Sequence, residues 1–436
     1  MSDTDPVGEN SSPSSTFENF ESSVRSYSRT FPKLFTRARG AYLYAEDGSR
    51  YLDFLTGCSS LNYGHNHPVL KQALLDYIER DGVTHGLDLH NDGKEAFLRE
   101  FAETILAPRK LDYVVQFPGP TGANAVEAAL KLARKVTGRQ SVIAFTNGFH
   151  GVTLGALACT GNEYHRSGAG VPLSGVDRML YDDYLGRNVD TADCLDRMLS
   201  DASSGIDLPA AVIVETVQGE GGLNAASSDW LRKIAEITRR HGALLIVDDI
   251  QAGAGRTGTF FSFEPAGIHP DIVTMAKSIS GYGLPMSLVL IDRRFDQWAP
   301  GEHNGTFRGN CHAFVTATAA LREFWRGDTF QAAIGERGEQ LTEGLSSIVR
   351  KCGPRAIERR GRGMMQGIRF ESGEVAADVV DAAFDGGLIV ETSGPEDEIV
   401  KCLAPLTITE REFDRGLDLL ERAVSGALQQ PRKDAA

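Results

Sequence analysis

The stretch ALLIVDDIQAGAGRTG, residues 243–258, decides the fold. It opens with five apolar residues in a row, which is typical of a strand covered on both faces of a sheet. The run ends at Asp248 and Asp249. Because an isolated buried charge is very costly, Asp248 needs a partner. A protonated ring nitrogen of a ligand, a helix N-terminus or a salt bridge would each serve.

Similar apolar runs recur on both sides of this stretch and alternate with helical patterns. In one helical pattern, Val126, Ala129, Leu130 and Ala133 follow the spacing of a single helix face. Alternation of strands and helices predicts an α/β fold with a mainly parallel, doubly wound sheet. The strands expected are Tyr113–Phe117, Val142–Phe145, Ala211–Val214, Leu244–Val247, Ile272–Met275 and Ser287–Ile291.

The rest of the chain predicts a second, smaller unit built from both chain ends. Residues 1–16 have little to bury and are expected to form a disordered tail. Residues 17–75 would be the N-terminal part of the small domain, with a hairpin over Tyr42–Leu55. Residues 76–325 would form the large domain. Residues 326–436 would complete the small domain, with helices near Gln340–Cys352, Val375–Phe384 and Glu410–Ala427 and a strand near Met364–Phe370.

Polar or glycine-rich clusters follow nearly every expected strand of the large sheet. In open α/β sheets, ligands bind at the carboxyl ends of the strands, so these clusters should converge on one site. The five clusters are Pro118–Asn124, Thr146–Gly151, Glu215, Asp248–Asp249 and Lys277.

Three of these clusters match the parts of one cofactor. Gly119–Asn124 precedes a helix whose N-terminus would suit a phosphate, although an ordinary capped helix fits too. Lys277 lies just past a buried strand, where burial favours the neutral amine that forms imines; a lysine that reaches the surface is the alternative. With Asp248 for a ring nitrogen, they predict pyridoxal 5'-phosphate (PLP) chemistry.

The wording of these segments resembles the class III (ω-type) PLP aminotransferases of fold type I, over about residues 17–427. The strongest match is IVDDIQAGAGRTG with Lys277 placed 29 positions after Asp248. Several segments resemble one branch more closely, the L-2,4-diaminobutyrate:2-oxoglutarate aminotransferases. They are GPTGANAVEAA, FTNGFHG, VETVQGEGG, KSISGYGLPM and GEHNGTFRGN.

The resemblance implies roles around the cofactor. Lys277 would bond to it covalently and then carry the proton, and Asp248 would pair with the ring nitrogen. Gln251 would lie near the ring hydroxyl, and Phe149 would stack on the ring, followed by His150 in the FHG motif. The phosphate would be held by Thr121, Gly122 and Ala123. Thr306 would reach the phosphate of a neighbouring subunit, which implies a homodimer or larger homo-oligomer.

The resemblance also places the substrate, and here the sequence departs from the family. Glu220 of GEGG matches a carboxylate that screens a substrate-binding arginine. Lys401 stands where that arginine is usual, in IVKCLAPL. A lysine cannot make the bidentate fork to a carboxylate. The loop Thr56–Tyr63, with Asn62 and Tyr63, is a second departure and is expected to border the substrate.

Other classes of protein fit less well. The formal charge of −14, without a dense basic run, argues against nucleic acid as a partner. Six scattered cysteines, no signal peptide and no long apolar run indicate a cytoplasmic protein off the membrane. A metal enzyme would have to use His65, His67, His85 and His90, without a recognisable ligand motif. Within PLP chemistry, racemisation, aminomutation, or the substrates ornithine, acetylornithine or 4-aminobutyrate remain alternatives, whereas a PLP-binding regulator would need a DNA-binding module.

Overall fold

The computed structural model describes residues 13–186 and 188–429 of the chain. Most of the predicted disordered tail, residues 1–12, lies outside this part. Helix α1 (Pro13–Phe20) begins inside the remainder of that predicted tail. No helix in the described ranges combines the length and the apolar character needed to cross a bilayer.

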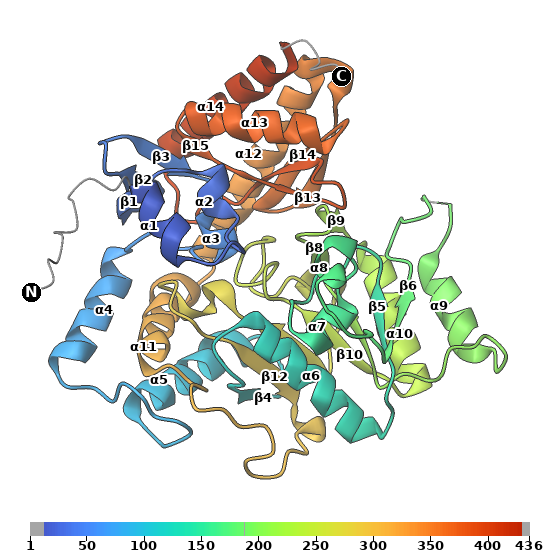
Figure 1. Ribbon diagram of the computed structural model, residues 1–436. Coiled ribbons are helices and arrows are strands. Elements are labelled where there is room, and N and C mark those ends of the chain that lie inside the picture. The colour runs from blue at the N-terminus through green and yellow to red at the C-terminus, as the bar shows by residue number, and fades with distance from the viewer. Residues whose placement is uncertain (1–12, 187, 430–436) are drawn as a thin grey trace, which may run out of the picture.

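A seven-stranded sheet forms the centre of the larger part of the molecule (Figure 1). Only β12 runs antiparallel to its neighbours, so the sheet is mainly parallel, as predicted. All six predicted strands are present. The seventh, the edge strand β6, was missed because its residues mix charged with apolar side chains. In spatial order the strands are β4 (Tyr113–Gln116), β12 (Leu288–Asp292), β11 (Ile272–Met275), β10 (Leu244–Asp248), β7 (Ala211–Val214), β5 (Val142–Phe145) and β6 (Val176–Met179).

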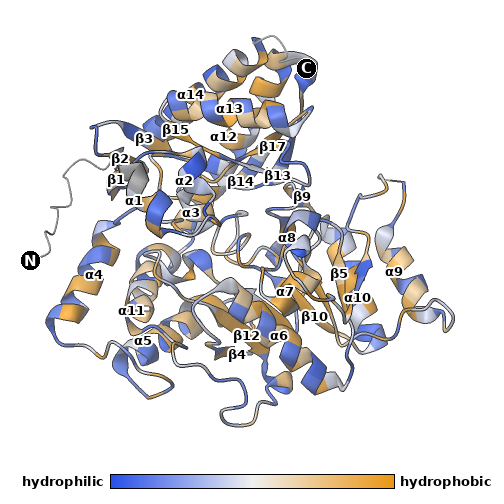
Figure 2. Cartoon of the chain, in the orientation of Figure 1, coloured by the Kyte–Doolittle hydropathy of each residue, from blue (hydrophilic) through white to orange (hydrophobic). Residues whose placement is uncertain are grey.

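Successive side chains of these strands enter two different cores. Ile246 and Ile213 pack with α6 (Gly122–Thr137) and α7 (Leu154–Cys159). Their neighbours Leu245 and Val212 pack on the other face, in the core that includes α5 (Asp92–Phe101), α9 (Thr191–Ser200), α10 (Ser228–His241) and α11 (Cys311–Ala320). Burial on both faces explains why the strands are continuously apolar, as their colour in Figure 2 shows.

The smaller part joins the two ends of the chain, as predicted. Its first sheet comprises β1 (Phe35–Arg39), β2 (Tyr42–Ala45), β3 (Arg50–Asp53) and β15 (Leu388–Ile389). Strand β15 pairs with β3, Leu388 opposite Leu52. The second sheet is antiparallel, in the order β13 (Ala356–Arg362), β14 (Met365–Phe370), β17 (Ile399–Cys402), β16 (Glu391–Ser393). Three helices complete this part: α12 (Thr329–Cys352), α13 (Gly373–Asp385) and α14 (Glu410–Gln429).

Arg256 ties the two parts together at the carboxyl ends of the strands. Its guanidinium is completely buried and donates hydrogen bonds to Ser59 Oγ at 2.7 Å and to the carbonyl oxygens of Met364 and Ala404 at 3.2 and 2.6 Å. Burial lowers the pKa of Arg256 to about 9. Because three distant segments share this one donor, the loop after β10 is fixed against the smaller part.

Candidate active site

A cavity of about 420 Å³ lies at the carboxyl ends of the parallel strands, where the sequence predicts a site. It collects residues from five strand-end segments and from the loop after Thr56. Among its lining residues are most of the predicted site residues: Thr121, Gly122, Ala123, Phe149, His150, Glu220, Asp248, Gln251 and Lys277.

Asp248 closes β10 with its carboxylate facing three donors. Oδ2 lies 2.7 Å from His150 Nδ1, and Oδ1 accepts hydrogen bonds from Thr274 Oγ1 at 3.1 Å and from the Ile250 amide at 3.2 Å. Burial opposes a charge on His150, but the hydrogen bond and the charge of Asp248 outweigh it and raise the pKa of His150. His150 therefore contacts the Asp248 carboxylate, and it would influence a ligand bound to Asp248 through that carboxylate.

Lys277 leaves the sheet in a strained conformation. It follows β11 by two residues and has a φ of +52°, which non-glycine residues rarely adopt. The next residue, Ser278, holds this turn through its hydroxyl, which donates to the Ser59 carbonyl at 2.5 Å. Strain of this kind persists only where the surroundings fix it. Lys277 lines the same cavity as Asp248.

The N-terminus of α6 forms one wall of the cavity. Asn124 Oδ1 accepts hydrogen bonds from the backbone N–H of Thr121 at 3.1 Å and from its hydroxyl at 2.9 Å, which fixes the first turn. A side chain on Gly122 would lie within 2.9 Å of Ile250, so glycine lets the helix start pack on the loop after β10. The free N–H groups and the helix dipole favour an anion at this position.

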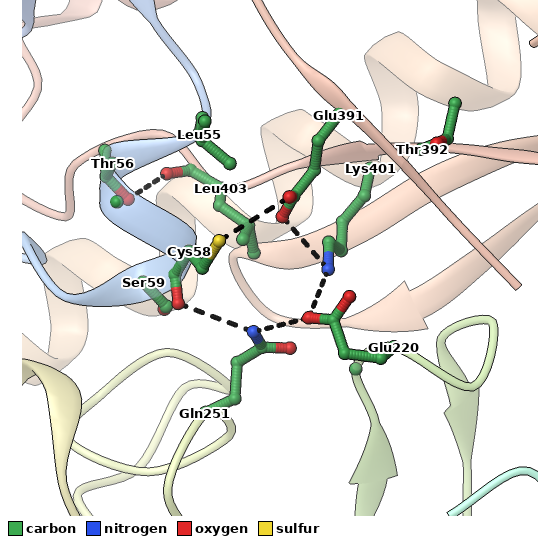
Figure 3. A network of polar contacts seen from close by, with 12 residues as sticks. Leu55, Thr56, Cys58, Ser59, Glu220, Gln251, Glu391, Thr392, Lys401 and Leu403 are labelled. Atoms are coloured by element: carbon green, nitrogen blue, oxygen red, sulfur yellow. Dashed lines mark hydrogen bonds and ion pairs between the residues drawn. The ribbon is translucent and has the colours of Figure 1, made fainter. Parts of the chain in front are cut away.

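A chain of polar contacts closes the far side of the cavity (Figure 3). Gln251 Nε2 donates to Glu220 Oε1 at 3.0 Å, and the same oxygen accepts from Lys401 Nζ at 2.9 Å. Lys401 Nζ also lies 3.0 Å from Glu391 Oε1. Lys401 is completely buried, whereas the Glu220 side chain is 32% exposed, toward the cavity. The Glu220 carboxylate therefore borders the cavity, and the Lys401 ammonium lies behind it.

The charges in this chain of contacts stabilise one another. Burial alone would lower the pKa of Lys401, but Glu220 and Glu391 raise it well above its ordinary value. Burial works against the Glu220 carboxylate, yet Lys401 and Lys277 lower its pKa. Burial, together with repulsion from Glu220, raises the pKa of Glu391 against the attraction of Lys401. Lys401 is thus a fixed cation that two carboxylates share.

Two residues of the site had no predicted role: Glu215, which was expected at this edge of the sheet only by its position, and Glu391, which was not predicted. Glu215 follows β7, and its carboxylate accepts hydrogen bonds from the backbone N–H groups of Phe149 at 2.8 Å and Gly219 at 3.2 Å. Burial raises the pKa of Glu215 to about 7. Its position after a strand was the available signal. Glu391 had only a weak signal, a single charge at the end of the apolar run Leu388–Val390.

Four predicted site residues lie outside the cavity lining: Lys401, which lies behind Glu220, and Asn62, Tyr63 and Thr306. Asn62 is buried and bonds to Ala254 O and Arg256, and Tyr63 accepts from Trp325 Nε1 at 2.8 Å and stacks on Phe324. Both serve packing here, in contrast to the expected substrate contact. Thr306 is exposed on a loop.

Three of the four histidines considered for a metal site make other contacts. His65 Nε2 lies 2.7 Å from Asp53 Oδ2, and the rings of His67 and His85 pack on Phe324 and Phe307. Within residues 13–186 and 188–429, no group of three or more His, Cys, Asp or Glu side chains has an arrangement that could hold a metal ion.

Comparison with known proteins agrees with this geometry. The family model described as "Aminotransferase class-III" matches residues 24–424. The chain is 58% identical to diaminobutyrate–2-oxoglutarate transaminase of Vibrio parahaemolyticus, over 94% of this chain and 96% of the relative. It is 57% identical to the transaminase of the same name from Nocardia farcinica, over 94% and 93% of the two chains.

Solved structures show the same fold at lower identity. An ornithine aminotransferase from Toxoplasma gondii superposes with a TM-score of 0.82 at 28% identity, covering 95% of this chain and 94% of that one, and is described with partial occupancy of PLP at its active site. An aminotransferase from Bacillus anthracis gives a TM-score of 0.84 at 25% identity, covering 94% and 97%. From the matched family model and the identity to these relatives, the chain belongs to the class III aminotransferases.

Proposed function

We propose that this protein transfers an amino group between L-glutamate and aspartate 4-semialdehyde, giving 2-oxoglutarate and L-2,4-diaminobutyrate. The observation that carries the proposal is its 52–58% identity to diaminobutyrate–2-oxoglutarate transaminases over at least 94% of the chain. Ornithine aminotransferases match the fold, but at 23–28% identity. The proposed substrates are therefore those of the more similar relatives.

The residues of the cavity fit PLP as the cofactor. When bound, PLP supplies an electron sink for the substrate carbon that loses its proton. The N-terminus of α6 would hold the phosphate, and Asp248 would keep the ring nitrogen protonated. Lys277 would bind the cofactor and move the proton. Gln251 Oε1 is buried without a hydrogen-bond partner in the described part of the chain, beside the expected place of the ring hydroxyl.

One cavity must accept two substrates of different charge. Diaminobutyrate would react through its terminal amine, whereas glutamate would react through its α-amine and bring two carboxylates. We propose that the Glu220–Lys401 pair is closed for diaminobutyrate and opens for glutamate. On opening, a substrate carboxylate replaces Glu220 as the partner of Lys401.

We also propose a homodimer. Thr306 lies in a loop beside the segment 83–90. Other residues of this loop contact that segment, through the bridge between His85 and Asn310 and the Arg308–Asp88 ion pair of 2.9 Å. These two segments expose large apolar side chains, which is unusual unless a partner covers them. The exposed residues are Val83, Leu87, Leu89 and Phe307. A cytoplasmic location is proposed because all six cysteines are free thiols.

A substrate comparison tests the proposed function. The purified enzyme with PLP should convert diaminobutyrate and 2-oxoglutarate with a higher kcat/KM than ornithine, acetylornithine or 4-aminobutyrate paired with the same acceptor. Glutamate formation, measured by a coupled assay, is the readout. Preference for one of the other amines would contradict the substrate assignment. Release of the D-enantiomer or of an isomeric amino acid, without an acceptor, would instead indicate racemisation or aminomutation.

A further inference from the structure

Lys401 faces two carboxylates that come from different parts of the fold (Figure 3). Glu391 lies directly opposite Lys401 in the antiparallel pairing of β16 with β17. Side chains paired in this way project to the same face of the sheet, so the sheet itself fixes their separation. Glu220 comes from the turn between β8 (Val217–Gln218) and β9 (Asn224–Ala225) in the larger part.

Glu391 is held on its other side as well. Its Oε2 accepts a hydrogen bond from the Tyr27 hydroxyl at 3.1 Å and contacts Cys58 Sγ at 3.6 Å. Burial and the charge of Glu391 raise the pKa of Cys58 to about 12, so the thiol keeps its proton. Cys58 reaches this position because its backbone is left-handed, with a φ of +53°. The Glu391 side chain is only 8% exposed, and its contacts with Lys401, Tyr27 and Cys58 hold it on both sides.

Glu220 has the opposite surroundings. Both of its described side-chain hydrogen bonds use the same oxygen, Oε1. Its side chain borders the active-site cavity and also a second cavity of about 330 Å³, lined in part by Asn147, Thr392 and Ser393. Ser393 Oγ is buried without a hydrogen-bond partner among the described residues. The second cavity thus offers the Glu220 side chain space away from Lys401. Its lining also includes three carboxylates, Glu163, Glu396 and Asp397, so the move would depend on the polar groups of Asn147, Thr392 and Ser393.

We propose that Glu391 is a positioning residue that holds Lys401 in place when Glu220 leaves to admit the carboxylate of glutamate. This inference deepens the proposed function and rests on it. A lysine side chain is flexible, and without a second partner Lys401 would follow Glu220. With Glu391 fixed opposite, the departure of Glu220 breaks the ion pair and leaves the ammonium where the substrate carboxylate can reach it. The loss of Glu391 should therefore impair glutamate and spare diaminobutyrate.

Two variants of Glu391 and one dicarboxylate probe test this role. In the PLP-loaded enzyme, Glu391→Ala should raise the KM for glutamate and the Kd of glutarate about tenfold or more, as expected for a lost charge-assisted hydrogen bond. The KM for diaminobutyrate should change by less than about threefold, and kcat with it should be kept. Glu391→Gln keeps a hydrogen-bond acceptor without the charge, so its KM for glutamate and its Kd for glutarate should lie between those of the wild type and those of Glu391→Ala. If the alanine variant does not fold, the glutamine variant carries the test.

The matched control is Glu358→Gln. Glu358 is a carboxylate of the same sheet that pairs with Arg360 and Arg369 away from the cavity, and it should leave both constants unchanged. Equal losses for glutamate and diaminobutyrate, or an unchanged Kd for glutarate in a folded Glu391 variant, would overturn the proposal. If the wild-type enzyme does not use diaminobutyrate, the proposed function fails, and glutarate binding still decides the role of Glu391.

Discussion

His150 Nδ1 lies 2.7 Å from Asp248 Oδ2, and both side chains are almost completely buried. This contact fixes the orientation of the Asp248 carboxylate at the end of β10, and burial shields both side chains from solvent. The charge of Asp248 raises the pKa of His150 against the effect of burial. A histidine whose pKa is raised by folding stabilises the protein below its unfolded pKa, and this contribution is lost as the pH rises through the folded pKa.

The first prediction therefore concerns His150→Gln. At pH 5 to 6 this variant should be less stable than the wild type by about 2–3 kcal/mol, the cost of a buried hydrogen bond to a charged group. The difference should shrink as the pH rises toward 9. Chemical denaturation of the cofactor-free protein across this range measures it, with His165→Gln as the control on the exposed side of Phe149. A difference that does not change with pH would show that charge has no part in the pair.

The second prediction concerns Glu215, whose pKa burial raises to about 7. Between its ordinary pKa and pH 7 the folded protein binds more protons than the unfolded chain, so stability falls as the pH rises. A shift of this size corresponds to about 3 kcal/mol. Glu215→Gln should remove this part of the slope between pH 5 and pH 8. Asp249, with its pKa also raised to about 7 by burial, should keep the remainder. An unchanged slope in the variant would contradict the assignment.

The central strands were predictable from the sequence because burial alone determines their apolar pattern. The five uninterrupted apolar residues before Asp248 predicted a strand buried on both faces, and the structure confirms that these residues are buried. Lys401 was recognised only by its departure from a family pattern. Nothing near it in the sequence indicated that Glu391, ten residues earlier, would lie opposite in a pairing of β16 with β17. Register between such short strands depends on tertiary packing.

Tyr63 is a residue that the sequence placed at the site and the structure places in the core. Its place in a loop that departs from the family pattern suggested a substrate contact, yet its ring stacks on Phe324 and its hydroxyl accepts from Trp325. A tyrosine that buries its ring and bonds its hydroxyl suits a core as well as a site. Sequence position alone does not distinguish these two roles, because both require the same side chain.

The third prediction concerns Lys277 and the cofactor. The purified wild-type protein should be yellow, and borohydride should attach the cofactor permanently to a peptide that contains Lys277. Lys277→Ala should lose both the attachment and turnover, because no other lysine lines the cavity among the described residues. Mass spectrometry of the reduced protein identifies the labelled peptide. Full turnover by Lys277→Ala, or label on another lysine, would contradict the assignment.

The fourth prediction concerns assembly. If Thr306 completes the phosphate site of a partner subunit, Thr306→Ala should weaken PLP binding by about 1–3 kcal/mol. Equilibrium dialysis gives the affinity, and light scattering gives the mass in solution. Thr329→Ala, at the start of α12, serves as a control that should not alter PLP affinity. A fully active monomer with wild-type PLP affinity would rule out the shared site.

The last prediction concerns Lys401, the only buried cation between Glu220 and Glu391 in the described structure. Because the glutamate carboxylate would replace Glu220 at this ammonium, Lys401→Ala should raise the KM for glutamate about tenfold more than that for diaminobutyrate. The alanine variant leaves two buried carboxylates without their cation, so it should also lose stability, which thermal unfolding measures. Lys401→Arg keeps the charge and offers a bidentate fork, and it should therefore retain the use of glutamate. Equal increases in both KM values for a folded Lys401→Ala protein would show that the pair does not distinguish the two substrates, even if the aminotransferase chemistry is intact.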